Sequence, residues 1–231
     1  MSTHFLGVRN GIYNRYTPSS INADYMNLLK GVYGNDVLVN RYDNGMLEAD
    51  DVMRKIFTGL ERKGYLSDSI VFIIGDHGEG LGEHKHFGHD KFVYQEDIGI
   101  PMLIYDSDDH RYANLEFASQ LDVAPTILDR LGLDIPSSWE GKSLLKQATT
   151  SYSYHQTRGG PYIYAVLYRE GKNIYKYIRW ERDRDTGKVR EELYELNSDP
   201  AELCDLLPSG ESELIQKMRT KAKEVFDLDD S

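Results

Sequence analysis

The sequence predicts an α/β fold that ends in a small antiparallel sheet and a helix. Two observations support the α/β part: an amphipathic helix leads into a continuous apolar run, and a second apolar run with its own helix follows. In residues 151–196, tyrosine-rich segments are separated by short polar turns, as in an antiparallel meander. We therefore expect an α/β core over residues 1–148 and an α+β subdomain over residues 149–231.

The composition argues against a nucleic-acid-binding surface and against a membrane-spanning helix. The 231 residues carry a formal net charge of −11, and the acidic residues are spread along the chain, so a basic nucleic-acid-binding stripe is not expected. The longest apolar runs have four or five residues, whereas a membrane helix needs roughly 20, and the first residues lack a signal-peptide pattern. We expect the chain as given to be soluble. Its compartment is undetermined, because the single cysteine, Cys204, allows no internal disulfide.

The first part of the core is expected to be mostly loop. Residues 7–44 are rich in Tyr, Asn and Gly, with a short helical stretch at residues 23–30. From residue 44 to residue 62, apolar side chains recur along one helix face. The pattern predicts an amphipathic helix, which Asp43 and Asn44 would cap.

Two apolar runs predict strands of the core sheet. Residues 69–74 form a β-branched run bounded by Gly75, as a strand buried on both faces should. Residues 100–105 form the second run, with a proline only near its start. A helix over residues 122–131, with Asp122 as its cap, is expected next.

The carboxyl-terminal subdomain is expected to be a sheet covered by one helix. Its predicted strands are residues 162–168, 174–180 and 191–196, separated by glycine-containing turns. Residues 211–226 place apolar side chains on one helix face, which would cover that sheet. The tyrosines could line a carbohydrate cleft, although such stripes more often serve sheet packing.

The residues with the strongest chemical signal follow the first predicted strand, in residues 75–89. Ligands of α/β proteins gather at the carboxyl ends of strands. Asp76 and His77 lie at such an end, and a carboxylate beside an imidazole suits a divalent cation. The glycines that follow let the backbone bend tightly and approach an anion.

Residues 75–84, Gly-Asp-His-Gly-Glu-Gly-Leu-Gly-Glu-His, closely resemble the Ser-Asp-His-Gly-Glu-x-Leu-Gly-Glu-His signature of the sulfatases, which belong to the alkaline phosphatase superfamily. Other segments resemble further parts of that family in the same order, namely residues 94–104, 120–133, 139–145 and 192–203. The resemblance implies an alkaline-phosphatase-like sheet sandwiched by helices. It also implies a metal-dependent hydrolase of sulfuric esters.

The resemblance assigns roles to four residues. Asp76 and His77 would hold the metal, with Ca²⁺ the expected ion for a sulfatase. His89, twelve residues beyond His77, would contact the ester group or assist the leaving group. His4 would reach the same anion from another loop, so the hypothesis requires both catalytic histidines to converge on Asp76. By the same parallel, Glu79 and Glu83 have structural roles, and we expect the other two histidines of this stretch, His84 and His86, to be solvated.

The sequence also departs from the family pattern. The family's nucleophile and its first acidic metal ligands have no counterpart, and residues 1–6 read like the end of a buried strand. We therefore expect a fragment with half of an active site, catalytically incomplete alone. One alternative is a phosphodiesterase or phosphoethanolamine transferase of the same superfamily, using Zn²⁺ or Mn²⁺. Another is a noncatalytic truncated interaction domain, whose open sheet edge would drive self-association. The substrate would be a sulfate or phosphate ester, with a carbohydrate as a candidate alcohol.

Overall fold

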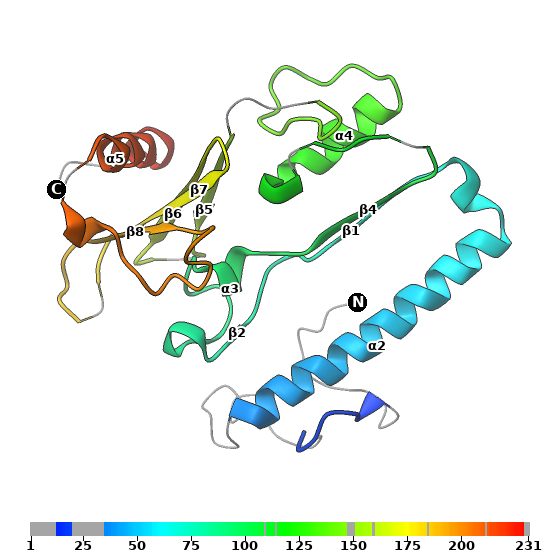
Figure 1. The fold of residues 1–231 in the computed structure, drawn as a ribbon, viewed down its shortest axis with the longest axis horizontal. Coiled ribbons are helices and arrows are strands. Elements are labelled where there is room, and N and C mark those ends of the chain that lie inside the picture. Colours follow the sequence, from blue (N-terminus) through cyan, green and yellow to red (C-terminus); the bar gives the residue numbers. More distant parts are fainter. Residues whose placement is uncertain are drawn as a thin grey trace. The chain divides into compact units, whose positions relative to one another are not determined.

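The computed structural model describes residues 13–19, 35–108, 110–113, 115–146, 151–158, 160–183, 185–210 and 212–228 (Figure 1). The chain divides into two compact units. The first comprises Met1–Val71, Glu79–His89 and Tyr105–Asp108, and the second comprises Phe72–Gly78, Asp90–Ile104 and Asp109–Ser231. The division predicted after residue 148 stays a prediction. The strand expected at residues 1–6 and the short helix at residues 23–30 lie outside the described residues.

Helix α2, Asn35–Arg62, is the main element of the first unit. It begins earlier than the predicted start at residue 44, because Val37 and Leu38 are buried against Leu81 and Phe87. These two partners belong to a short antiparallel hairpin of β2 (Gly80–Leu81) and β3 (Phe87–Gly88). Tertiary burial thus extends the helix into a segment whose composition favoured a loop.

Asn44 is fully buried inside α2, so the predicted capping by Asp43 and Asn44 is wrong. The side-chain oxygen of Asn44 accepts hydrogen bonds from the amides of Arg15 and Tyr16, both at 2.9 Å. Its side-chain nitrogen donates to the Tyr16 carbonyl at 2.8 Å. Asn44 therefore anchors the described segment 13–19 against the helix.

Strands β1 (Ile70–Ile74) and β4 (Met102–Asp106) are hydrogen-bonded neighbours. At one end the Ser107 amide donates to the Ser69 carbonyl at 2.9 Å, and at the other the Gly75 amide donates to the Pro101 carbonyl at 3.2 Å. The strands are therefore antiparallel. The expected burial on both faces is wrong for the described residues, since the side chains of both strands keep exposed surface, led by Leu103 at 58%.

The second unit contains an antiparallel sheet in the order β5-β6-β7-β8, formed by Ser151–Gln156, Ile163–Glu170, Asn173–Trp180 and Arg190–Glu195. Strands β6, β7 and β8 match the three strands predicted from the tyrosine-rich segments, whereas β5 was not predicted. Successive side chains point to opposite faces. Ala165 and Leu167 pack with Val93, whereas Val166 and Tyr168 pack against α5, Glu213–Phe226 (Figure 1). The predicted sheet covered by a helix is confirmed.

Helix α4, Val123–Arg130, closely matches the predicted helix at residues 122–131. Asp122 makes no side-chain cap to α4, so its predicted role is wrong. Its carboxylate instead accepts hydrogen bonds from the amides of Ser119 at 2.9 Å and Lys142 at 2.8 Å. The remaining helices are α3, Gln95–Ile98, and the 3₁₀ turns Tyr65–Asp68, Glu83–Lys85, Leu115–Phe117, Gln120–Asp122 and Leu207–Ser209. Among the described residues, every helix is too short or too polar to span a membrane.

Candidate metal centre

The loop after β1 is held by three hydrogen bonds within the second unit. The side-chain nitrogen of Gln120 donates to the carbonyls of Gly75 at 2.8 Å and Asp76 at 3.0 Å. The Gly78 amide donates to the Asp97 carbonyl at 2.8 Å. A Cβ at Gly78 would lie 2.0 Å from the Glu96 carbonyl oxygen, so only glycine fits this approach.

Asp76 and His77 follow the end of β1, as predicted. The Asp76 side chain is 82% exposed, and its Oδ2 lies 3.7 Å from His77 Nε2. His77 Nδ1 lies 2.7 Å from the Gly78 carbonyl oxygen. Since a carbonyl only accepts, Nδ1 is the donor in this contact, and in the corresponding neutral tautomer the lone pair lies on Nε2. That tautomer suits a metal ligand.

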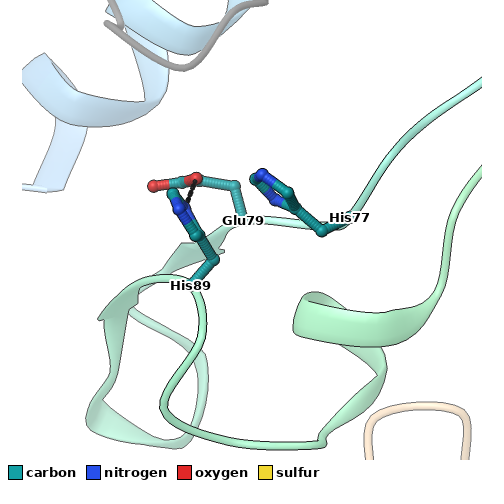
Figure 2. A group of neighbouring side chains, drawn as sticks. All are labelled: His77, Glu79 and His89. Atoms are coloured by element: carbon teal, nitrogen blue, oxygen red, sulfur yellow. Dashed lines mark hydrogen bonds and ion pairs between the residues drawn. The ribbon is translucent and has the colours of Figure 1, made fainter. Parts of the chain in front are cut away.

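Glu79 and His89 form the buried part of the site (Figure 2). His89 Nδ1 lies 2.8 Å from Glu79 Oε2, and the two side chains are only 12% and 8% exposed. Glu79 Oε1 is buried and has no hydrogen-bond partner within the described ranges. Burial, and after it the charge of Glu79, raises the pKa of Tyr42, so this phenol stays protonated.

His77, Glu79 and His89 each offer a ligand atom, and these atoms all lie within 4.8 Å of one another (Figure 2). Two imidazole nitrogens and a carboxylate oxygen are a usual donor set for a divalent transition metal. The buried, unpartnered oxygen of Glu79 is the feature that such an ion would satisfy. The residues present therefore fit a metal.

The sequence-predicted residues are only partly brought together. His77 and His89 lie in the group, Asp76 lies beside His77 but outside it, and His4 lies outside the described residues. Glu79, for which the family parallel implied a structural role, also lies in the group; its position two residues after His77 was the available signal. The prediction that His86 is solvated is wrong: it is 4% exposed, and a Cβ at Gly80 would lie 2.6 Å from its ring.

A cleft of about 1070 Å³ lies within the second unit and includes Asp76 and His77 in its lining. Tyr152, Tyr154 and His155 of β5 contribute another part of its wall. The cleft is large enough for a small organic ligand. Tyr152 and Tyr154 also pack against the cluster that tyrosines of β6 and β7 form with α5, so the tyrosine-rich strands serve both cleft and core.

Comparisons with known proteins identify related sequences and a related fold. A sulfatase family model matches residues 1–133, and a model described as N-sulphoglucosamine sulphohydrolase, C-terminal, matches residues 82–227. Arylsulfatase K from Bos taurus is 30% identical over 191 residues, covering 75% of this chain and 34% of that protein. The multifunctional alkaline phosphatase superfamily protein PehA from Trinickia caryophylli is 38% identical over 102 residues, covering 42% of this chain and 20% of that protein.

A solved structure described as a complex with its substrate D-glucosamine-2-N,6-O-disulfate has the same fold, with a TM-score of 0.65 at 23% identity. The match covers 84% of this chain and 41% of that one. The matches thus span about a third of one curated relative and a fifth of the other. Because the sulfatase model matches more than half of the residues, the chain belongs to the sulfatase family.

Proposed function

We propose that this chain supplies metal ligands and an ester-binding histidine to a hydrolase of sulfuric esters. The observation that carries the proposal is the group formed by His77, Glu79 and His89 directly after a strand of the α/β core. The activity of the whole protein is part of the proposal, and we assign no nucleophile among the residues of this chain.

The proposed metal ligands are Asp76 and His77, with Glu79 as a third donor. Two ligands at about 2.1 Å from one ion lie roughly 3 to 4 Å apart. The 3.7 Å between Asp76 Oδ2 and His77 Nε2 is compatible with a shared ion. When bound, a divalent metal stabilises negative charge that develops on the transferred group.

The resemblance favours Ca²⁺, whereas the imidazole donors favour Zn²⁺ or Mn²⁺, because Ca²⁺ prefers oxygen ligands. Because Zn²⁺ and Mn²⁺ are the ions expected for a phosphoryl-transferring enzyme of the superfamily, such an enzyme is the second candidate function. All three ions therefore belong in the test.

His89 is proposed to bind the ester or to protonate its leaving oxygen. Its hydrogen bond to the buried Glu79 fixes the orientation of the ring, which is what a proton donor at a defined position requires. The cleft beside Asp76 and His77 would hold the alcohol part of the substrate. A sulfated sugar is the proposed class, supported by the relative solved with a disulfated glucosamine.

The first test is calorimetric titration of Zn²⁺, Mn²⁺ and Ca²⁺ into the chelator-treated chain. We expect binding of one ion per chain, lost in an Asp76→Ala/His77→Ala variant and retained in His84→Gln, which alters a loop histidine outside the group. Binding that persists in the double variant would place the ion elsewhere and overturn the metal assignment. Because we assign no nucleophile to this chain, the two chemistries are compared by the affinity of the metal-loaded chain for an aryl sulfate and for an aryl phosphate.

A further inference from the structure

A second, smaller pocket lies wholly within the second unit. Its lining is positively charged, whereas the chain as a whole is acidic. Its volume is about 160 Å³, and Lys91, Arg158 and Arg182 contribute to its lining, with Asp90 as the one acidic residue there. The chain as a whole has 38 acidic and 27 basic residues. Three cations around one small pocket are therefore a local reversal of charge.

The pocket is built on ordered strand ends. Ile163 of β6 pairs with Trp180 of β7, so the segments that carry Arg158 and Arg182 leave the sheet at the same end. Thr157 fixes the Arg158 segment, because its amide donates to the Ile163 carbonyl and its hydroxyl accepts from the Ile163 amide, both at 3.0 Å. Thr157, Ile163 and Trp180 are all buried.

The donors around this pocket lack acceptors. Within the part of the chain that the structure describes, Lys91, Arg158 and Arg182 form no ion pair or hydrogen bond. The indole N–H of Trp180, which also lines the pocket, has no acceptor there either. By contrast, Arg190 lies over the Trp180 ring and is paired with Asp183 and Glu192.

We propose that this pocket binds an oxyanion: a sulfate, phosphate or carboxylate group. Guanidinium groups bind such anions through paired, charge-assisted hydrogen bonds. The volume suits one anionic group rather than a whole sugar.

In the chain, Asp90 and Lys91 directly follow His89, the proposed ester-binding residue. The pocket would therefore hold the second anionic group of a substrate with at least two. This choice of substrate class rests on the proposed function, whereas anion binding by the pocket does not.

The test uses the only other tryptophan, Trp139, which is exposed and can be removed. In a Trp139→Phe background, sodium sulfate is titrated into the metal-free protein while Trp180 fluorescence is recorded, with sodium chloride at matched ionic strength as reference. We expect a saturable change for sulfate only. Arg158→Gln/Arg182→Gln should weaken binding roughly tenfold or more, whereas Lys172→Gln, in the β6–β7 turn, should not. No saturable change, or equal binding by the arginine variant, would overturn the pocket assignment.

The substrate class is tested by calorimetric titration of esters into the metal-loaded chain. The arginine variant should weaken binding of a doubly anionic ester roughly tenfold and leave binding of a singly anionic aryl sulfate unchanged. An equal effect on both esters would overturn the second-anion role. Failure of the metal-loaded wild-type chain to bind either ester would reject the proposed function and its substrate class, while the sulfate titration still decides whether the pocket binds anions.

Discussion

Lys176 and Glu202 form an ion pair of 2.7 Å in which neither side chain has exposed surface. The pair also holds helix α3: Glu202 Oε2 accepts the Gln95 amide at 2.6 Å, and Lys176 Nζ lies 3.4 Å from Gln95 Oε1. Two residues later, the Asp97 carbonyl accepts the Gly78 amide. A buried pair under the carboxyl-terminal sheet therefore supports the loop that carries Asp76 and His77.

Breaking this pair is expected to be costly. Burial lowers the pKa of Lys176 and raises that of Glu202, so each charge depends on its partner. Glu202→Gln removes one charge, keeps the shape of the side chain and leaves the Lys176 ammonium buried. We expect a loss of about 3 to 5 kcal/mol of unfolding free energy, measured by urea denaturation.

A double-mutant cycle separates the pair from other effects. Lys176→Met/Glu202→Gln removes both charges, so its cost should be clearly smaller than the sum of the single variants. Additive costs would show that the two residues do not stabilise each other.

Gly78→Ala should disturb the proposed metal loop. The added Cβ would lie 2.0 Å from the Glu96 carbonyl oxygen, which is backbone and cannot turn away. We expect a loss of about 1 to 3 kcal/mol of stability together with weaker metal binding, measured by denaturation and calorimetry. Gly59→Ala is the matched control, because a Cβ at this position of α2 meets no atom within 4 Å. Unchanged metal affinity in Gly78→Ala would show that the close approach of Gly78 to the Glu96 carbonyl does not affect the metal site.

The elements with a clear hydrophobic period were predicted well. The body of α2 and helices α4 and α5 follow the three-and-four spacing of their apolar residues, and β6 to β8 follow tyrosine-rich runs. The start of α2 was missed because Val37 and Leu38 are buried by the distant hairpin of β2 and β3. β5 was missed because Ser151–Gln156 is a polar, tyrosine-containing segment that becomes a strand by pairing with β6.

Candidate site residues that belong to a family motif could be predicted from the sequence. Residues whose role depends on burial in the fold could not. His77 and His89 follow from the motif and its spacing. Glu79 lies in a glycine-rich loop that reads as solvent-exposed, and only the fold brings it beside His89. The burial of Lys176 cannot be predicted from the sequence, because a lysine in an antiparallel strand normally points to solvent.

Glu79→Gln should weaken metal binding by about 10- to 100-fold, as loss of a carboxylate that ligates a metal or orients a ligating histidine does. Glutamine preserves the size of the side chain and one acceptor oxygen, so the fold should be retained. Calorimetry with the ion that binds the wild-type chain measures the effect. Glu83→Gln is the control from the same loop, since its carboxylate accepts the Leu81 amide and lies outside the metal-binding group. Equal metal affinity of Glu79→Gln and Glu83→Gln would show that Glu79 does not contribute to the site.

His155 should make the protein sensitive to acid. Burial, with a smaller effect of the Lys176 charge, lowers the pKa of His155 from 6.5 to about 4. Ser153 Oγ lies 2.9 Å from its Nε2, a contact that suits the neutral ring. In the unfolded chain the ring takes up its proton near pH 6.5, so the unfolded state binds more protons than the folded state below that pH.

The contribution of His155 to stability is therefore complete above about pH 6.5 and is lost as the pH falls toward 4, by up to about 3 kcal/mol. Carboxylates also titrate in this window, so the test compares wild type with His155→Gln, which cannot take up a proton. Urea unfolding at pH 7.5, 6, 5 and 4, values chosen to bracket about 6.5 and 4, should give a steeper decline for the wild type. Parallel declines would mean that the imidazole is protonated in the folded protein as readily as in the unfolded chain.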